Sequence, residues 1–156
     1  MNPHRLTFGA VLTVFLTTSQ PVPAQPQPSE QHKRLEFFVG DWKSEGEEKS
    51  SPAGPGAKST STEHCEWFDG QFHVVCGADI TESGRKSKEL VVLGYDSQAA
   101  VYTRYHIGSD GQSSMATAKL EGKTWRWQGG SKGMQVRFPW TETSADSFDF
   151  EVEVSG

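Results

Sequence analysis

Short segments that alternate apolar and polar residues recur along most of the chain, and turn-forming residues separate them at regular intervals. The expected strands are 41–49, 58–68, 71–81, 88–96, 100–107, 113–120, 124–128, 134–142 and 147–155. Asp-Gly, Ser-Gly, Glu-Gly and Gly-Gly pairs stand between them, which is the chemistry of tight turns. No strand alternates with a long helix, so the pattern excludes parallel α/β folds and their nucleotide sites. The sequence predicts an antiparallel meander of about nine strands.

The last segment, 147–155, alternates so strictly that one face is apolar and the other acidic. The apolar face holds Phe148, Phe150, Val152 and Val154, and the acidic face holds Asp149, Glu151 and Glu153. We expect the apolar face to be buried and the acidic face to be exposed to solvent, as in a sheet that packs on one side. Consecutive hairpins without a sign of a crossover favour an up-and-down barrel over a sandwich.

Two segments before the strands differ from the rest of the chain. Residues 1–24 have a basic start, a short apolar run and small residues at their end, the arrangement of a secretory signal peptide. A Pro-rich linker at 25–28 precedes a single domain at 29–156, which opens with a short helix at 29–39. In this helix we expect Ser29 to be the N-cap and Leu35 and Phe38 to face inward. No second apolar run could span a bilayer, so we expect a secreted or periplasmic protein.

The composition excludes several classes of partner and cofactor. The chain has a net charge of −5 at pH 7, which argues against binding to nucleic acid or to an anionic membrane surface. The stretch GPGAKST resembles a phosphate-binding loop, but Lys58 does not directly follow a Gly, no apolar strand precedes it and no helix follows. No Gly-x-Ser-x-Gly elbow or usable Ser, His and Asp spacing is present, so we expect no cofactor and favour binding over catalysis. The sequence does not indicate an oligomeric state.

The two cysteines of the chain, Cys65 and Cys76, stand on either side of an Asp-Gly pair. With Gly70 and Gln71 at the centre of a two-residue turn, the cysteines lie directly opposite each other, at a separation that suits a disulfide. With Asp69 and Gly70 at the centre, they slip to a diagonal and the bridge is strained. A disulfide is the usual state of such a pair in an exported protein, whereas zinc would need two further ligands.

Three stretches carry a resemblance to a known family. In chain order they are LEFFVGDWKSEGE, CEWFDGQFHVVC and LGYDSQAAVYTRYHI. Together they resemble domain-of-unknown-function family 1579, whose mostly bacterial and often exported members are assigned to lipocalin-like (calycin) barrels. The resemblance implies a lipocalin-like barrel with a ligand cavity and brings no established activity. Because such domains usually end with a further hairpin strand, either the barrel is left open at its C-terminal end or the sequence is truncated.

Large aromatic residues on the expected inward faces indicate a ligand cavity. The candidate ligand-binding residues are Trp67, Trp125, Trp127 and Trp140, with Tyr102 or Arg104 as the polar contact. The alternative is that these residues are simply core, which leaves a structural or protein-interaction barrel with a filled interior. Haem held by His106 and a barrel enzyme are further alternatives, and an enzyme would need a buried, paired carboxylate or histidine. The sequence thus predicts an exported barrel that binds a small apolar or amphipathic molecule.

Overall fold

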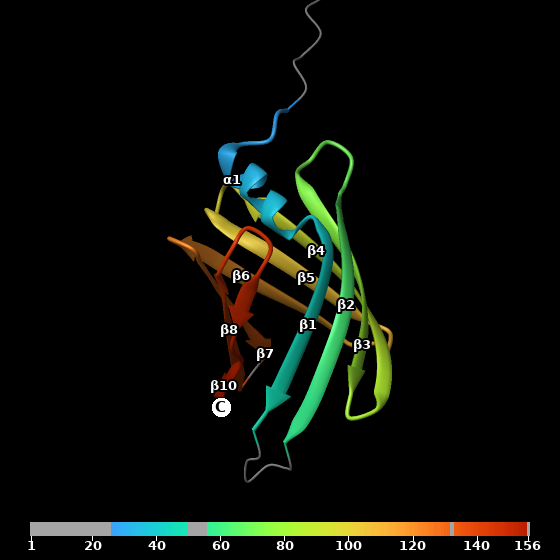
Figure 1. Cartoon of the computed structure of the whole chain (residues 1–156). Coiled ribbons are helices and arrows are strands. Elements are labelled where there is room, and N and C mark those ends of the chain that lie inside the picture. The colour runs from blue at the N-terminus through green and yellow to red at the C-terminus, as the bar shows by residue number, and fades with distance from the viewer. Residues whose placement is uncertain (1–25, 50–55, 132, 156) are drawn as a thin grey trace, which may run out of the picture.

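The described part of the chain is mostly β-sheet (Figure 1). A computed structural model describes residues 26–49, 56–131 and 133–155. The expected signal peptide, residues 1–24, lies outside the described residues. A short helix, α1 (Glu30–Lys33), continues into a 3₁₀-helix, η1 (Arg34–Phe38), and strands follow. They are β1 (Gly40–Glu48), β2 (Ala57–Trp67), β3 (His73–Glu82), β4 (Arg85–Asp96), β5 (Val101–Gly108), β6 (Ser113–Glu121), β7 (Thr124–Ser131), β8 (Met134–Glu142), β9 (Phe148–Phe150) and β10 (Glu153–Ser155).

Each strand from β1 to β8 pairs antiparallel with the next one along the chain. Both β9 and β10 pair with β8, and their registers form one continuous ladder. Pro139 of β8 lies opposite the gap between β9 and β10 and has no N–H to donate. The hydrogen bond that remains there runs from Glu151 N to the carbonyl oxygen of Pro139, at 3.2 Å. β9 and β10 are therefore two parts of one edge strand.

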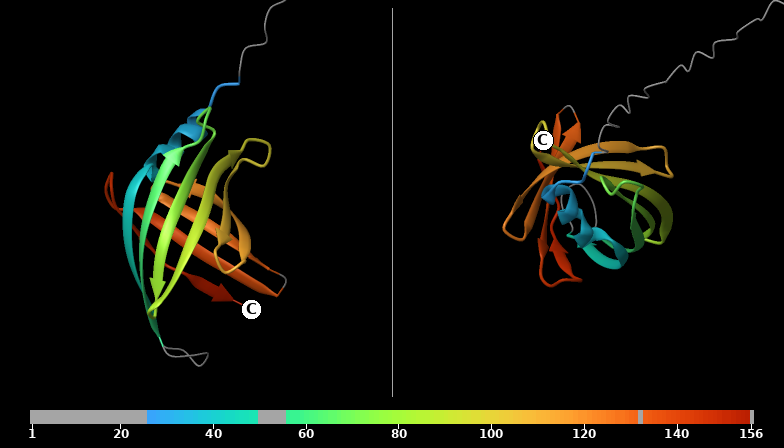
Figure 2. Two further views of the ribbon diagram at one scale, coloured as in Figure 1. Left: turned by 90° about the vertical axis from the view of Figure 1, so that its right-hand side faces the viewer. Right: turned by 90° about the horizontal axis from the view of Figure 1, so that it is seen from above.

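The sheet curls around itself into a half-barrel with open edges (Figures 1 and 2). Among the described residues, no backbone ladder joins β1 to β9 or β10. The expected all-β, up-and-down architecture is confirmed, together with its short N-terminal helix and its incomplete closure at the C-terminal end. Aromatic side chains bridge part of the open seam. The Phe148 ring lies 5.3 Å from Trp42 of β1 and 5.3 Å from Trp140 of β8, measured between ring centroids.

The helical segment lies across one end of the half-barrel (Figure 2). Ser29 caps α1 as expected, because its side chain accepts a hydrogen bond from His32 N while its own N–H donates to His32 Nδ1 at 3.2 Å. Burial lowers the pKa of His32, which favours the neutral imidazole that can accept this bond. Leu35 and Phe38 of η1 are buried, so the inward face that the sequence predicts is confirmed.

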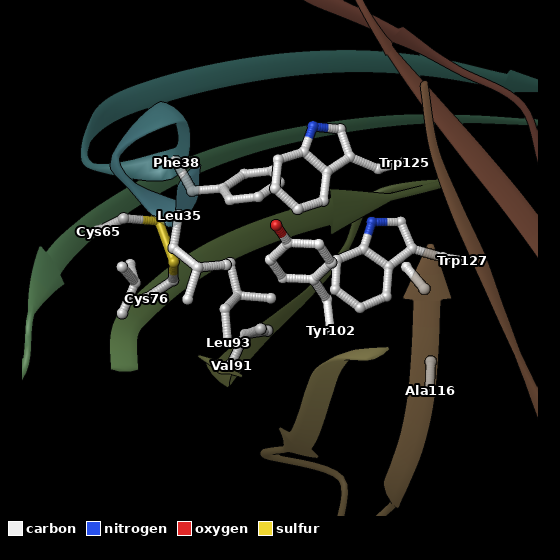
Figure 3. Close-up of a cluster of buried hydrophobic side chains, with 12 residues drawn as sticks. Leu35, Phe38, Cys65, Cys76, Val91, Leu93, Tyr102, Ala116, Trp125 and Trp127 are labelled. Carbon is white, nitrogen blue, oxygen red and sulfur yellow. A yellow bond between two sulfur atoms is a disulfide. The ribbon is translucent and has the colours of Figure 1, made fainter. Parts of the chain in front are cut away.

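The core fills the end of the half-barrel next to the helices (Figure 3). Trp125 and Trp127 of β7 are 0% and 1% exposed, and their ring centroids are 6.4 Å apart in a stacked arrangement. Phe38 and Tyr102 pack on Trp125 with ring centroids at 4.8 and 4.7 Å. The space left beside the disulfide and Trp140 is about 10 Å³, room for about one water molecule. This end of the interior is therefore filled.

The hairpin of β2 and β3 holds Cys65 directly opposite Cys76, and a disulfide joins them, with the two Cα atoms 4.0 Å apart. The expected pairing is confirmed, but the turn differs from the one that we expected. Gln71 N donates to Phe68 O, so the Asp-Gly pair is central in the turn. Phe68 N donates to His73 O at 2.9 Å and closes a loop over residues 69–72. This longer loop lets the Asp-Gly pair stay central without moving the cysteines to a diagonal.

The C-terminal edge strand keeps the expected faces but lacks the expected burial. Phe150 and Val154 lie opposite Trp140 and Val136 of β8, so the apolar side chains do point to the concave side of the sheet. Phe150, Val152 and Val154 are nevertheless 38%, 59% and 64% exposed, and the expectation that they are buried is wrong. The reason is the open seam, because no strand of the described chain pairs with the free side of β9 and β10.

Candidate functional site

Polar side chains line the concave face beyond the aromatic core. They come from alternate positions of β1, β2, β4 and β5, namely Ser44, Ser61, Glu63, Ser87, Glu89, Arg104 and His106. The two serines of β1 and β2 contact each other, with Ser44 Oγ 2.7 Å from Ser61 Oγ. We define the interior charge cluster as Glu63, Glu89, Arg104 and His106. The concave face thus has a filled apolar half and a polar half.

Strand alternation determines where the interior charge cluster lies. Side chains two positions apart on a strand point to the same side of the sheet. On each strand the first cluster residue lies two positions from a buried core residue: Glu63 precedes Cys65, Glu89 precedes Val91, and Arg104 follows Tyr102. The cluster is therefore the direct continuation of the core along the same face.

Glu89 and His106 form a half-buried contact. His106 Nε2 lies 3.0 Å from Glu89 Oε1. The His106 side chain is 17% exposed and the Glu89 side chain is 25% exposed. Despite this short distance, Nε2 has no hydrogen-bond partner among the described residues. On its other side, His106 Nδ1 lies 3.4 Å from Ser114 Oγ. A barrel enzyme would require a buried, paired carboxylate or histidine; this pair is only half-buried, and its geometry does not assign a reaction.

Arg104, like His106, has a buried nitrogen without a hydrogen-bond partner among the described residues. In Arg104 this atom is Nε. Its guanidinium carbon lies 5.8 Å from the centre of the Phe138 ring on β8. Burial lowers the pKa of Arg104, while the charges of Glu89 and Glu63 oppose this shift. A buried donor without a partner costs about 1 to 3 kcal/mol, so Arg104 is held in the interior at a cost that a hydrogen-bond acceptor would relieve.

Small neighbours explain how Arg104 reaches β8. On the concave face, Arg104 of β5 lies opposite Ala116 of β6, which in turn lies opposite Gly129 of β7. A Cβ atom at Gly129 would lie 2.9 Å from Met115 O and 3.2 Å from Ala116 Cβ, so a larger residue would force a shift. Because neither Ala116 nor Gly129 projects far into the interior, the guanidinium can extend over both strands to Phe138.

Glu63 lies at the border between the filled core and the interior charge cluster. It lines the small space beside the disulfide, and its carboxylate is within 4.8 Å of the sulfur atoms of Cys65 and Cys76. Burial raises the pKa of Glu63, Arg104 opposes this shift, and Glu89 adds to it. A carboxylate and two thiols could bind a metal ion, but the disulfide removes both thiolate ligands.

A second hollow lies along β6, β7 and β8, with a volume of about 420 Å³. Its lining includes the outward-facing Thr117 and Gln128 and the inward-facing Ala116 and Val136, around Gly129. None of the buried polar atoms without a partner in the described chain belongs to this hollow. The concave face is therefore the stronger candidate site.

A family model described as a protein of unknown function, DUF1579, matches residues 27–154. The chain belongs to this family. The match extends from the helical segment into β10, so the half-barrel as a whole is the DUF1579 domain. No curated protein matches the chain. Among the described residues, no helix is both long and apolar enough to cross a membrane.

The DUF1579 half-barrel places most of the predicted ligand-binding residues in its filled end. Trp125, Trp127 and Tyr102 belong to the core, and burial raises the pKa of Tyr102. Trp140 packs on this core, with its ring centroid 5.8 Å from that of Trp127 and 5.7 Å from that of Phe38. These aromatic rings contact one another, which leaves little room for a ligand between them.

The remaining two predicted residues lie apart from each other. Trp67, at the end of β2, donates from Nε1 to Glu36 Oε2 at 2.5 Å, beside the helical segment. Arg104 is the predicted residue that reaches the polar half of the concave face. Sequence reasoning missed Glu63 and Glu89, although alternation from Cys65 and Val91 places both on the inward face. The assumption that inward residues are apolar hid them.

Proposed function

We propose that the half-barrel binds a small amphipathic molecule on its concave face and performs no chemistry on it. The observation that carries this proposal is the buried Nε of Arg104, which has no partner and lies beside the Phe138 ring. A polar group without a partner next to an apolar surface suits a ligand with one polar end and an apolar body. The filled aromatic end argues against a purely apolar ligand among the tryptophans.

The apolar body of the ligand has a matching wall on β8 and the edge strand. Val136 and Phe138 are half-buried on the concave face, and Phe150 and Val154 are exposed on the same side. Covering apolar side chains on a concave wall gains about 25 cal/mol for each Å² removed from water. A ligand with its polar end at Arg104 would cover this wall with its body.

Nile red tests the proposal, because this uncharged fluorescent dye has a carbonyl acceptor on an aromatic body. We expect saturable binding to the wild type and about fivefold weaker binding to Arg104→Met, which keeps the length of the side chain without its donors. Arg126→Met is the matched control, since Arg126 is exposed on the convex face, where it pairs with Glu121. Absence of saturable binding to the wild type, or equal weakening in both variants, contradicts the proposal.

Export from the cytoplasm is part of the same proposal. It is supported by the signal-peptide pattern at 1–24 and by the disulfide between Cys65 and Cys76. Cell fractionation and N-terminal sequencing of the purified protein test it. We expect the mature chain outside the cytoplasm, beginning at Gln25. An uncleaved chain with free thiols in the cytoplasm would contradict export.

A protein-interaction role is the second candidate, and the convex face favours it. Leu90 lies opposite Ile107, Tyr105 lies opposite Met115, and all four side chains are exposed. A contiguous exposed apolar patch is typical of a surface that binds another protein. If Nile red does not bind the wild type and Ile107→Asp abolishes a self-association measured by light scattering, this candidate is the better account.

A further inference from the structure

The C-terminal edge strand, formed by β9 and β10, has one side without a partner. It pairs with β8 on one side, and no strand of the described chain pairs with the other. Glu151 N donates to Pro139 O of β8, so the backbone groups of Glu151 point to β8. Because successive residues of a strand point these groups to opposite sides, the N–H and C=O groups of Val152 and Val154 point to the open side. The edge therefore presents free backbone donors and acceptors.

Side-chain contacts with β1 are confined to the β9 part of this edge. The Phe148 ring packs on Trp42 of β1, and a Cβ atom at Gly46 of β1 would lie 3.7 Å from Phe150 Cζ. Beyond Phe150 the two strands diverge, and the end of β10 lies away from the end of β1 (Figure 2). The part of the edge that is free to bind a partner is therefore the part that includes β10.

The two faces of this free part differ in chemistry. On the concave face, Val152 and Val154 are largely exposed apolar side chains. On the convex face, Glu151 and Glu153 are exposed, and no ion pair of the described chain engages either carboxylate. Even Arg137, which lies opposite Glu153 on β8, forms no ion pair with it. A strand added here would meet apolar side chains on one face and negative charge on the other.

The charge of the edge argues against a second copy of the chain as its partner. Antiparallel pairing of two C-terminal edge strands would bring their carboxylates together, and like charges on paired strands are destabilising. The free edge of β1 has the same conflict, because its convex face carries Asp41, Glu45 and Glu47 with a single base, Lys43. Charge complementarity therefore requires a basic partner.

We propose that the C-terminal edge strand binds an extended segment of a partner protein in which basic and apolar residues alternate. The segment adds to the sheet as a further strand and hydrogen-bonds the free backbone groups of Val152 and Val154. Its apolar residues cover the two valines on the concave face, and its basic residues pair with Glu151 and Glu153 on the convex face. The inference goes beyond the proposed function and does not rest on it, because it uses the edge of the sheet and no group of the interior.

Fluorescence anisotropy of labelled peptides tests the chemistry of the partner. The probes are the heptapeptides KVKVKVK, KKVVVKK and EVEVEVE, which separate alternation from composition and from the sign of the charge. We expect saturable binding of KVKVKVK, about tenfold weaker binding of KKVVVKK, and no detectable binding of EVEVEVE. Equal binding of the two basic peptides would show attraction to the acidic chain alone and overturns the inference, as does absence of saturable KVKVKVK binding.

Hydrogen exchange measured by NMR locates the bound peptide. At a KVKVKVK concentration ten times its Kd, exchange of the Val152 and Val154 amides should slow about tenfold, because their N–H groups point to the open side. The Glu151 amide already bonds to Pro139 and should change little. Protection of the β1 amides alone overturns the inference. Protection of the two valines by self-association of the wild type, without peptide, also overturns it and makes a second copy the partner.

Variants of the edge separate its charge from its backbone. Glu151→Gln combined with Glu153→Gln should weaken KVKVKVK binding about fivefold. The matched control, Glu66→Gln combined with Glu82→Gln, removes the same charge from exposed positions of β2 and β3 and should change binding by less than about twofold. Val152→Pro removes a free N–H without breaking the ladder to β8 and should weaken binding about fivefold, and Val152→Ala, which keeps the N–H, by less. Equal weakening in the two charge variants, or unchanged binding in Val152→Pro, overturns the inference. Nile red takes no part in these measurements, so the proposed function stands or fails separately.

Discussion

Replacing Trp125 and Trp127 separately by Phe distinguishes the hydrogen bond of one indole from the packing of both. The two side chains are buried and stacked, so the two substitutions remove similar apolar volume. Trp125 Nε1 donates to Glu142 Oε1 at 2.7 Å, whereas Trp127 Nε1 is buried without a partner. We expect Trp125→Phe to lower the free energy of unfolding by about 1 to 2 kcal/mol more than Trp127→Phe, because it alone breaks a charge-assisted bond.

The expected difference is at the low end for such bonds, because Arg34 still contacts Glu142 at 2.6 Å after the substitution. Urea denaturation followed by circular dichroism measures it without interference from the altered tryptophan fluorescence. Alanine at either position should cost about 3 to 5 kcal/mol and leave the Nile red affinity of the folded variant unchanged. Equal losses in the two Phe variants would refute the hydrogen-bond argument, and a loss of dye affinity in the folded variants would place these residues in the ligand wall.

Three further predictions concern stability. Reducing the bond between Cys65 and Cys76, which are 11 residues apart, should lower the free energy of unfolding by about 3 kcal/mol. Thiol titration of the denatured, unreduced protein should find no free thiol, and two free thiols would contradict the bond. Phe148→Ala should destabilise the fold by about 3 kcal/mol and Val154→Ala by less than about 1, as denaturant midpoints can check; equal effects would contradict the aromatic seam. Burial raises the pKa of Glu63 above 4.5, so the stability that the protonated side chain contributes is lost as pH rises through the folded pKa. Glu63→Gln should therefore be more stable than the wild type at about pH 7 and equal to it at about pH 4. A wild type as stable as the variant at both pH values would contradict this.

The strand order and the disulfide could be predicted from the sequence because both depend on local, period-two patterns. Opposed positions in a hairpin fix Cys65 against Cys76 once the register is set, and apolar faces set the register. The turn between them was harder to predict, since a two-residue turn and the observed loop over 69–72 give the same cysteine pairing. One register thus fits more than one turn.

The candidate site was less predictable because it depends on what covers each face. Alternation places Val154 on the concave side, but its exposure follows from a seam that no strand closes. Aromatic residues on inward faces could line a cavity or fill it. This end is filled because Phe38 packs against Trp125, a contact between the helical segment and β7. The unpaired state of Arg104 is a property of the folded interior, which no pattern along the chain reports.

Mapping bound ligand by NMR of the side-chain methyl groups tests the central claim most directly, because the two faces of the sheet carry different methyls. Ala116, Val136 and Val154 lie on the concave face, and Leu90 and Ile107 lie on the convex face. With saturating Nile red, the account predicts shifts of the concave methyls and none on the convex face. Shifts confined to the convex methyls, or none on either face, would contradict binding in the half-barrel.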